Sequence, residues 1–279
     1  MSPEVRGGVV VPRGADTVLR NLRITPVGQS GVVCLRECGV HLEDIVVAGA
    51  SGGGVGVGFS ASLTARTLVV RDTDAGPGGT FGRGFSVDSG STAEVRRAFF
   101  DRNTEVGVAC FGSRLVLEDA YIRETRAQPF DDDFGRGLSV EQVGASAEAR
   151  RVVIERNLDI GIFVNEDAAL VAEDVVVRDT LPQTATGISG RGIAVQSRCS
   201  LELRRALLER NLEIGLYCGG EAATVDVEDL VVRDTLPRLS DGRGGRALEF
   251  EIGCGGSVTR GLFVNSRGGG VMAFESPGL

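Results

Sequence analysis

The chain has 279 residues, of which 42% are hydrophobic and 5% aromatic, so we expect a core of small aliphatic side chains. Its net charge of −8 argues against a nucleic-acid partner, because phosphate binding needs a basic surface. No apolar run approaches the roughly 18 residues of a membrane span, so we expect no membrane-spanning segment.

The chain is built from internal repeats, and most repeats start with a glycine that an apolar residue follows. In chain order the starts are Gly31, Gly54, Gly84, Gly107, Gly137, Gly161, Gly192, Gly215, Ala247 and Gly270. The spacing alternates between about 23 and about 31 residues, so a two-coil module of about 54 residues repeats along the chain.

Each coil contains two stretches in which apolar and polar residues alternate. Residues 161–164 are typical of the first stretch and residues 201–208 of the second. A period of two predicts strands with one buried face. Each coil then turns at Thr or Asn, and these positions are Thr73, Asn103, Thr125, Asn157, Thr180, Asn211 and Thr235.

From about Gly7 to Phe274 this pattern resembles the right-handed parallel β-helix of the pectin-lyase-like superfamily. The resemblance lies in the coil length, the short strands that glycine opens and the Thr/Asn ladder. It implies an all-β, single-stranded, right-handed solenoid of about ten coils, with residues 1–279 forming one β-helix domain of a larger protein. The alternative is a leucine-rich-repeat-type solenoid, because residues 203–211 fit the L-x-x-L-x-L-x-x-N pattern of that family.

Charged pairs alternate in sign from coil to coil. Because neighbouring coils stack about 4.8 Å apart, this alternation predicts two columns in which each charge lies between opposite charges. The first column comprises Arg71-Asp72, Asp101-Arg102, Arg123-Glu124, Glu155-Arg156, Arg178-Asp179, Glu209-Arg210 and Arg233-Asp234. The second comprises Arg96-Arg97, Glu118-Asp119, Arg150-Arg151, Glu173-Asp174, Arg204-Arg205 and Glu228-Asp229. A looser third column would combine Arg83, Glu105, Arg136, Asp159, Arg191, Glu213 and Arg246. Slippage by one coil would set like charges together, so we expect the columns to fix the coil register.

The cysteines and the single histidine favour structural roles. The cysteines occupy two positions of the coil: Cys34, Cys110 and Cys218 the fourth, Cys38, Cys199 and Cys254 the eighth. Equivalent cysteines lie two or more coils apart, which is too far for a disulfide, so we expect unpaired thiols inside the coils. His41 lies between the apolar Val40 and Leu42 and should face solvent.

Every second coil carries an extra loop of about ten residues at one corner, at residues 74–83, 126–136, 181–191 and 236–246. Stacked on one flank, these loops are where function would concentrate. Asp131, Asp132 and Asp133 lie beside Arg136 and could hold Ca²⁺ or supply an acid/base pair for glycoside cleavage. We favour a solvated acidic loop, because residues 181–190 in the middle of the flank carry no charge.

We therefore predict a non-enzymatic β-helix module that presents one loop flank, with carbohydrate as the expected ligand and no cofactor. The resemblance implies the alternative, a polysaccharide lyase or glycoside hydrolase at Asp131, although the Asn-Thr-Asp and Gly-His-Gly segments of polygalacturonase-like members are absent. We expect an extracellular or cell-surface location. The first residues lack signal-peptide anatomy, so a cytoplasmic location is the alternative. Open sheet edges at the solenoid ends also predict self-association.

Overall fold

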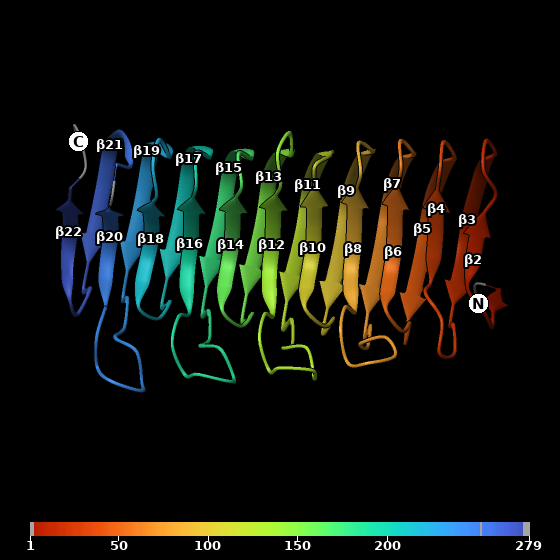
Figure 1. Ribbon diagram of the computed structural model, residues 1–279, viewed down its shortest axis with the longest axis horizontal. Coiled ribbons are helices and arrows are strands. Elements are labelled where there is room, and N and C mark those ends of the chain that lie inside the picture. The colour runs from red at the N-terminus through yellow and green to blue at the C-terminus, as the bar shows by residue number, and fades with distance from the viewer. Residues whose placement is uncertain (1–2, 252, 276–279) are drawn as a thin grey trace.

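The computed structural model describes residues 3–251 and 253–275, and these form two parallel sheets of 11 strands each, with no helix. Each coil adds one strand to each sheet, so the strands follow one another along a single axis (Figure 1). The long-strand sheet consists of β1 (Glu4–Val5), β3 (Asp16–Ile24), β5 (Gly39–Ala48), β7 (Ser62–Arg71), β9 (Thr92–Asp101), β11 (Arg114–Arg123), β13 (Ser146–Glu155), β15 (Ala169–Arg178), β17 (Ser200–Glu209), β19 (Thr224–Arg233) and β21 (Gly255–Val264). The short-strand sheet consists of β2 (Val9–Val11), β4 (Val32–Leu35), β6 (Gly53–Gly58), β8 (Arg83–Asp88), β10 (Val106–Phe111), β12 (Arg136–Glu141), β14 (Ile160–Asn165), β16 (Arg191–Gln196), β18 (Ile214–Gly219), β20 (Arg246–Glu251) and β22 (Gly269–Phe274).

These sheets confirm the predicted all-β parallel solenoid of about ten coils. The leucine-rich-repeat alternative is wrong. The segment around Leu203, which fits that family's pattern, lies in β17 and pairs in parallel with β15 and β19. The other half of each coil forms a second parallel sheet of 11 strands, in place of the leucine-lined convex side that a leucine-rich repeat would have.

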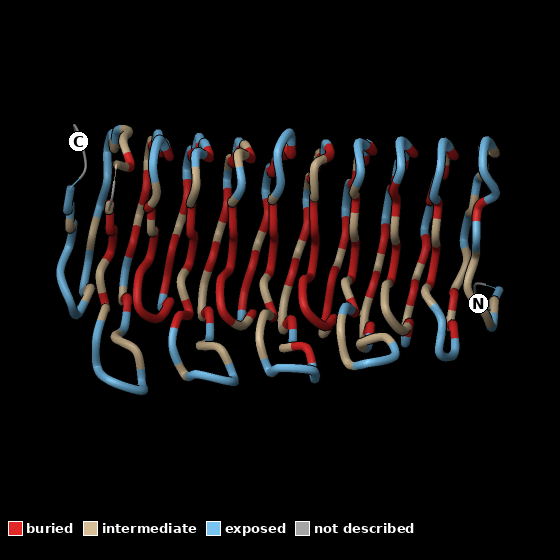
Figure 2. Tube along the Cα trace, in the orientation of Figure 1, coloured by how far each residue is buried: buried red, intermediate tan, exposed pale blue. Residues whose placement is uncertain are grey.

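The core lies between the two sheets, and Figure 2 shows buried positions along the strands and mostly exposed ones in the projecting loops. From Gly31 to Gly215, the glycines that start the coils form a column inside the solenoid, where a side chain would collide with the next coil. At Gly137, for example, a Cβ would lie 2.6 Å from the carbonyl oxygen of Gly161. The sequence marker of each coil start therefore reflects a close approach of two backbones.

The Thr/Asn ladder lies inside the solenoid, with side chains at most 2% exposed. Each asparagine reaches back to the coil before it. Asn157 Oδ1 accepts hydrogen bonds from Thr125 N at 3.0 Å and Thr125 Oγ1 at 2.7 Å, and its Nδ2 donates to the carbonyl of Ile122 at 3.3 Å. The ladder thus satisfies backbone groups at the corner where the coil turns.

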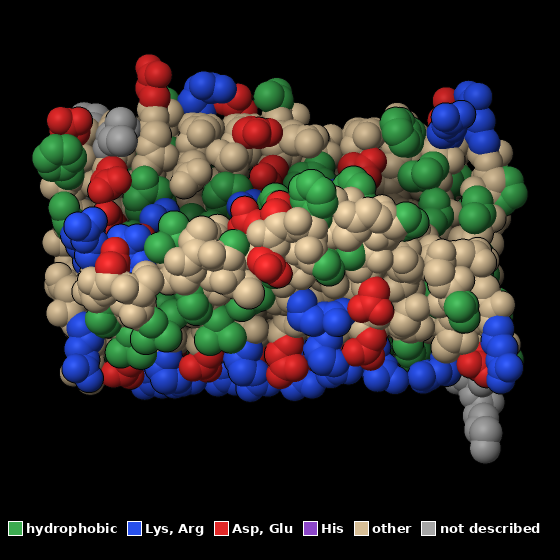
Figure 3. Space-filling view, turned by 60° about the horizontal axis from the view of Figure 1, so that its bottom comes forward, with side chains coloured by type: hydrophobic (Ala, Val, Ile, Leu, Met, Phe, Trp, Pro, Cys, Tyr) green, Lys and Arg blue, Asp and Glu red, His purple; other side chains and the backbone are tan. Residues whose placement is uncertain are grey.

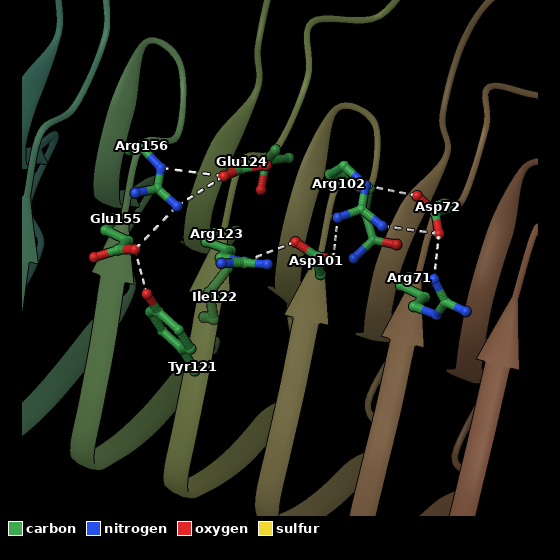
Figure 4. Close-up of polar contacts among 12 residues, drawn as sticks. Arg71, Asp72, Asp101, Arg102, Tyr121, Ile122, Arg123, Glu124, Glu155 and Arg156 are labelled. Carbon is green, nitrogen blue, oxygen red and sulfur yellow. Dashed lines mark hydrogen bonds and ion pairs between the residues drawn. The ribbon is translucent and has the colours of Figure 1, made fainter.

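The first charge column forms as predicted, and its pairing has a direction (Figure 4). From Arg102 onward, each arginine bonds the acid of the preceding coil, as in Arg102–Asp72 and Arg123–Asp101, both at 2.8 Å, whereas Arg71 pairs with Asp72 of its own coil. The full set is Arg102–Asp72, Arg123–Asp101, Arg156–Glu124, Arg178–Glu155, Arg210–Asp179 and Arg233–Glu209. Together these pairs connect every coil boundary from β7 to β19 once.

The second column also alternates, except at one boundary. Arg151 bonds Asp119 at 2.5 Å and Arg205 bonds Asp174 at 2.7 Å, again one coil back. The hydrogen bond from Arg151 lowers the pKa of Asp119. Between β7 and β9, however, Arg66 stands directly opposite Arg96.

The expectation of unpaired cysteines is wrong for four of the six. Cys34 pairs with Cys38 inside one coil, with Cα atoms 5.9 Å apart. Cys218 pairs with Cys254 of the next coil, with Cα atoms 6.0 Å apart. Comparing equivalent positions missed both pairs, because each bond joins the fourth position of a coil to the eighth position of the same or the next coil. Cys110 and Cys199 are free and buried.

Candidate binding site

Four longer loops project from one edge of the solenoid, before β8, β12, β16 and β20 (Figure 1). Backbone hydrogen bonds join neighbouring loops: Phe130 N donates to Gly79 O at 3.0 Å, and Ala185 N to Asp132 O at 3.1 Å. The first three loops of the predicted flank are therefore joined into one surface along the sheets.

The structure separates the sequence-predicted acidic site into parts. Asp131 accepts hydrogen bonds from its own loop, from Gln128 Nε2 at 2.9 Å and from Asp133 N at 3.1 Å. Asp132 is exposed. Arg136 pairs instead with Asp159 at 2.9 Å and Glu141 at 3.4 Å. Within residues 3–251 and 253–275, no three acidic, histidine or cysteine side chains gather as a metal site would require.

A row of arginines runs along the outer side of the short-strand sheet, beneath the loops. Its members occur at every second coil, about 10 Å apart; they are Arg83, Arg136, Arg191 and Arg246. The first three pair with an acid of the following coil, in Arg83–Glu105 at 2.9 Å, Arg136–Asp159 at 2.9 Å and Arg191–Glu213 at 3.1 Å. The acid side chains are only 3–8% exposed. The charge column expected to be the loosest is thus the most deeply buried, because the loops cover it.

Aromatic rings from the loops cover the first two arginines. The guanidinium carbon of Arg83 lies 5.2 Å from the ring centre of Phe81, and that of Arg136 lies 4.8 Å from Phe134. Each phenylalanine precedes the Gly-Arg pair of its coil. Ser189 holds the equivalent position in the third loop and Gly244 in the fourth. The last two arginines therefore lack an aromatic cover from the loop.

A cavity of about 630 Å³ opens where this cover is missing, between the last loop and strands β16, β18 and β20. Its lining includes Arg191, Tyr217, Arg238, Arg246, Glu249 and Glu251. Tyr217 lies in β18 with its ring centre 4.3 Å from the Arg191 guanidinium carbon. Figure 3 shows basic and acidic side chains gathered on this flank toward the C-terminal end.

The polar groups of the cavity are linked and partly buried. Tyr217 donates a hydrogen bond to Glu251 at 3.3 Å. Burial raises the pKa of Glu249, and the neighbouring Glu251 raises it further, against the opposing effect of Arg246. Burial also raises the pKa of Tyr217, as does the charge of Glu251. The arrangement offers hydrogen-bond donors and acceptors around one aromatic ring.

Sequence reasoning did not identify this cavity. A signal was present in the repeat: Phe-Gly-Arg-Gly at 81–84 and 134–137 becomes Ser-Gly-Arg-Gly at 189–192. The shared Gly-Arg-Gly marks the turn, and the residue before it decides whether the arginine is covered. His41 is exposed as predicted, and it contacts Thr64 at 2.7 Å and Asp16 at 3.2 Å on the long-strand sheet, away from the loops.

Fold and site together define the chain as an all-β parallel solenoid with an open polar cavity beneath one loop. No family model matches the chain, and no curated protein matches its sequence. Among solved structures, it is similar to the surface protein and adhesin PfbA of Streptococcus pneumoniae, at 7% identity over 96% of this chain and 91% of that chain. The TM-score of 0.27 is too low for this likeness to carry an argument. Among the described residues, no helix has the length and apolar character needed to cross a membrane.

Proposed function

We propose that this chain is a non-enzymatic β-helix module of a secreted or surface protein, and that its loop flank binds carbohydrate. The open cavity beside Tyr217 carries the proposal. Sugars offer apolar ring faces together with hydroxyl groups, so a site that combines an aromatic ring with convergent Arg and Glu side chains suits them. Kinship with the pectin-lyase-like superfamily and a right-handed winding belong to the same proposal.

The disulfides support a secreted or surface location. Cys34–Cys38 and Cys218–Cys254 are protein disulfides of a kind that persists in oxidising compartments and is rare in the cytosol. The alternative of a cytoplasmic location predicts that all six cysteines are reduced in the protein from its native source.

A glycan array tests the proposal, and the chain offers a matched control because it has two tyrosines. We expect the wild-type protein to be retained, Tyr217→Ala to lose retention, and Tyr121→Ala to keep it, since Tyr121 lies on the long-strand sheet and bonds Glu155. Equal retention of both variants would place the binding surface elsewhere.

The enzymatic alternative, a lyase or hydrolase at Asp131, Asp132, Asp133 and Arg136 with or without Ca²⁺, has its own test. Uronate-containing polysaccharides should then be cleaved by the wild-type protein and not by a variant with alanine at the three aspartates. No turnover on any of them would end this alternative.

Self-association through the solenoid ends is a further proposal, supported by the exposed Val271 of β22, whose register partner Leu248 in the preceding coil is buried. Sedimentation velocity tests it: a single monomer species over a wide concentration range would contradict it.

A further inference from the structure

The open cavity brings four arginine side chains together, those of Arg191, Arg238, Arg243 and Arg246, and one of them has an unsatisfied donor. Arg191 is paired with Glu213, and Arg246 is paired with Glu249. Arg238 differs from both. Its Nε is buried and has no hydrogen-bond partner among the described residues, because the oxygens of its ion-pair partners Glu213 and Asp241 lie 3.7 and 3.6 Å from it, beyond hydrogen-bond length. A buried donor without a partner is costly, so a ligand that accepts from it would bind favourably.

We propose that this cavity binds a tetrahedral oxyanion, the sulfate or phosphate ester of a sugar. The inference rests on the proposed carbohydrate binding and adds the chemical group that is recognised. Arg191 and Arg246 come from β16 and β20, whereas Arg238 comes from the loop above them. Their guanidinium groups therefore reach the cavity from different sides.

The geometry of the donors favours a tetrahedral group over a carboxylate. A carboxylate is planar and is satisfied by one bidentate guanidinium. A sulfate or phosphate ester presents three terminal oxygens in different directions, which suits donors that come from both a sheet and a loop. The hydroxyl of Tyr217 and the carboxyl group of Glu249 can meet the sugar hydroxyls beside it.

The repeat itself supplies a way to close the cavity. Phe81 and Phe134 cover their arginines with backbone φ of 64° and 65°, and Ser189 adopts φ 68° at the equivalent position. Ser189→Phe therefore introduces a side chain that two other coils already hold in this backbone conformation. We expect its ring to lie over Arg191, at the cost of the hydrogen bond from Ser189 Oγ to Asp159 O.

Isothermal titration calorimetry with four probes tests the proposal: a hexose 6-sulfate, the 6-phosphate, the corresponding uronate and the neutral hexose. We expect the two esters to bind the wild-type protein in a saturable way and more tightly than the uronate or the neutral sugar. Arg238→Gln should weaken ester binding at least about tenfold, because a charge-assisted hydrogen bond is lost. Ser189→Phe should weaken it as well. Arg126→Gln, a loop arginine that pairs with Asp74 outside the cavity, should leave it unchanged. Thermal melts confirm that each variant is folded.

Three results would overturn the proposal: no saturable ester binding, equal affinity for the uronate and the esters, or unchanged affinity in Arg238→Gln. Retention of neutral glycans on the array alongside any of these results would leave the proposed carbohydrate binding intact. If the wild-type protein is not retained on the glycan array but binds the esters in calorimetry, the proposed glycan binding is refuted and the oxyanion site stands.

Discussion

Asn157→Ala should strongly destabilise the solenoid, because it removes one rung of the interior ladder. The side chain is 1% exposed and makes three hydrogen bonds with Thr125 and Ile122. The substitution leaves a buried backbone N–H, a hydroxyl and a carbonyl without partners. At about 1–3 kcal/mol for each unsatisfied group, and with some relaxation, the free energy of unfolding should fall by about 3–6 kcal/mol.

Urea unfolding followed by far-UV circular dichroism measures this loss, and hydrogen exchange locates it in the coils of β11 and β13. Asn165→Ala is the matched control, because Asn165 Oδ1 is buried and has no hydrogen-bond partner among the described residues. Arg156→Ala removes a half-exposed ion pair with Glu124 and should cost no more than about 1 kcal/mol. If Asn157→Ala costs no more than Asn165→Ala, the interior ladder does not stabilise the coil corners as argued.

Four further outcomes are expected. Reversing Arg204 and Arg205 to glutamate places like charges against Glu173-Asp174 and Glu228-Asp229 of the neighbouring coils. The midpoint of urea unfolding should therefore fall further than when the loop residues Arg126 and Arg243 are reversed. Equal shifts would refute the role of the columns in fixing the coil register. Arg151 lowers the pKa of Asp119 in the folded state, so this ion pair stabilises the fold above about pH 3.9 and the stabilisation is lost as the pH falls through the lower pKa of the folded state. Arg151→Gln should therefore flatten the dependence of the free energy of unfolding on pH in this acid range. An unchanged dependence would contradict the role of the pair. Replacing Cys218 and Cys254 with alanine opens a loop with a sequence separation of 36 and should lower the free energy of unfolding by about 4 kcal/mol. In the native protein Cys110, whose pKa burial raises to about 12, should resist alkylation. Rapid labelling of Cys110 would show that the core is open.

The coils, the loop flank and the charge columns could be predicted because each depends on spacing along the chain. A parallel solenoid turns equal spacing into vertical stacking, so the spacing of 30 residues between Arg102 and Asp72 is enough to predict their contact. Spacing fails for contacts that cross between positions of the coil. Cys218 and Cys254 pair diagonally, and only the path of the corner brings them within reach.

The open cavity could not be predicted for a different reason. The burial of Glu213 and the position of Arg238 depend on how the last loop folds back over the sheet. One substitution, serine where earlier loops have phenylalanine, decides whether an arginine is covered. A pattern of period two reports which side of a strand faces inward, and it carries no information about what lies over the outer side.

The alternating charge columns also limit how a protein of this design can change length. Duplication of a two-coil module preserves the sign of every contact, whereas gain or loss of a single coil sets arginine against arginine or acid against acid. We therefore expect solenoids of this design to change length by two coils at a time, and each such step adds one loop and one arginine of the row. The register pair of Arg66 and Arg96, at the boundary between β7 and β9, is a mismatch of the kind that an odd step would leave.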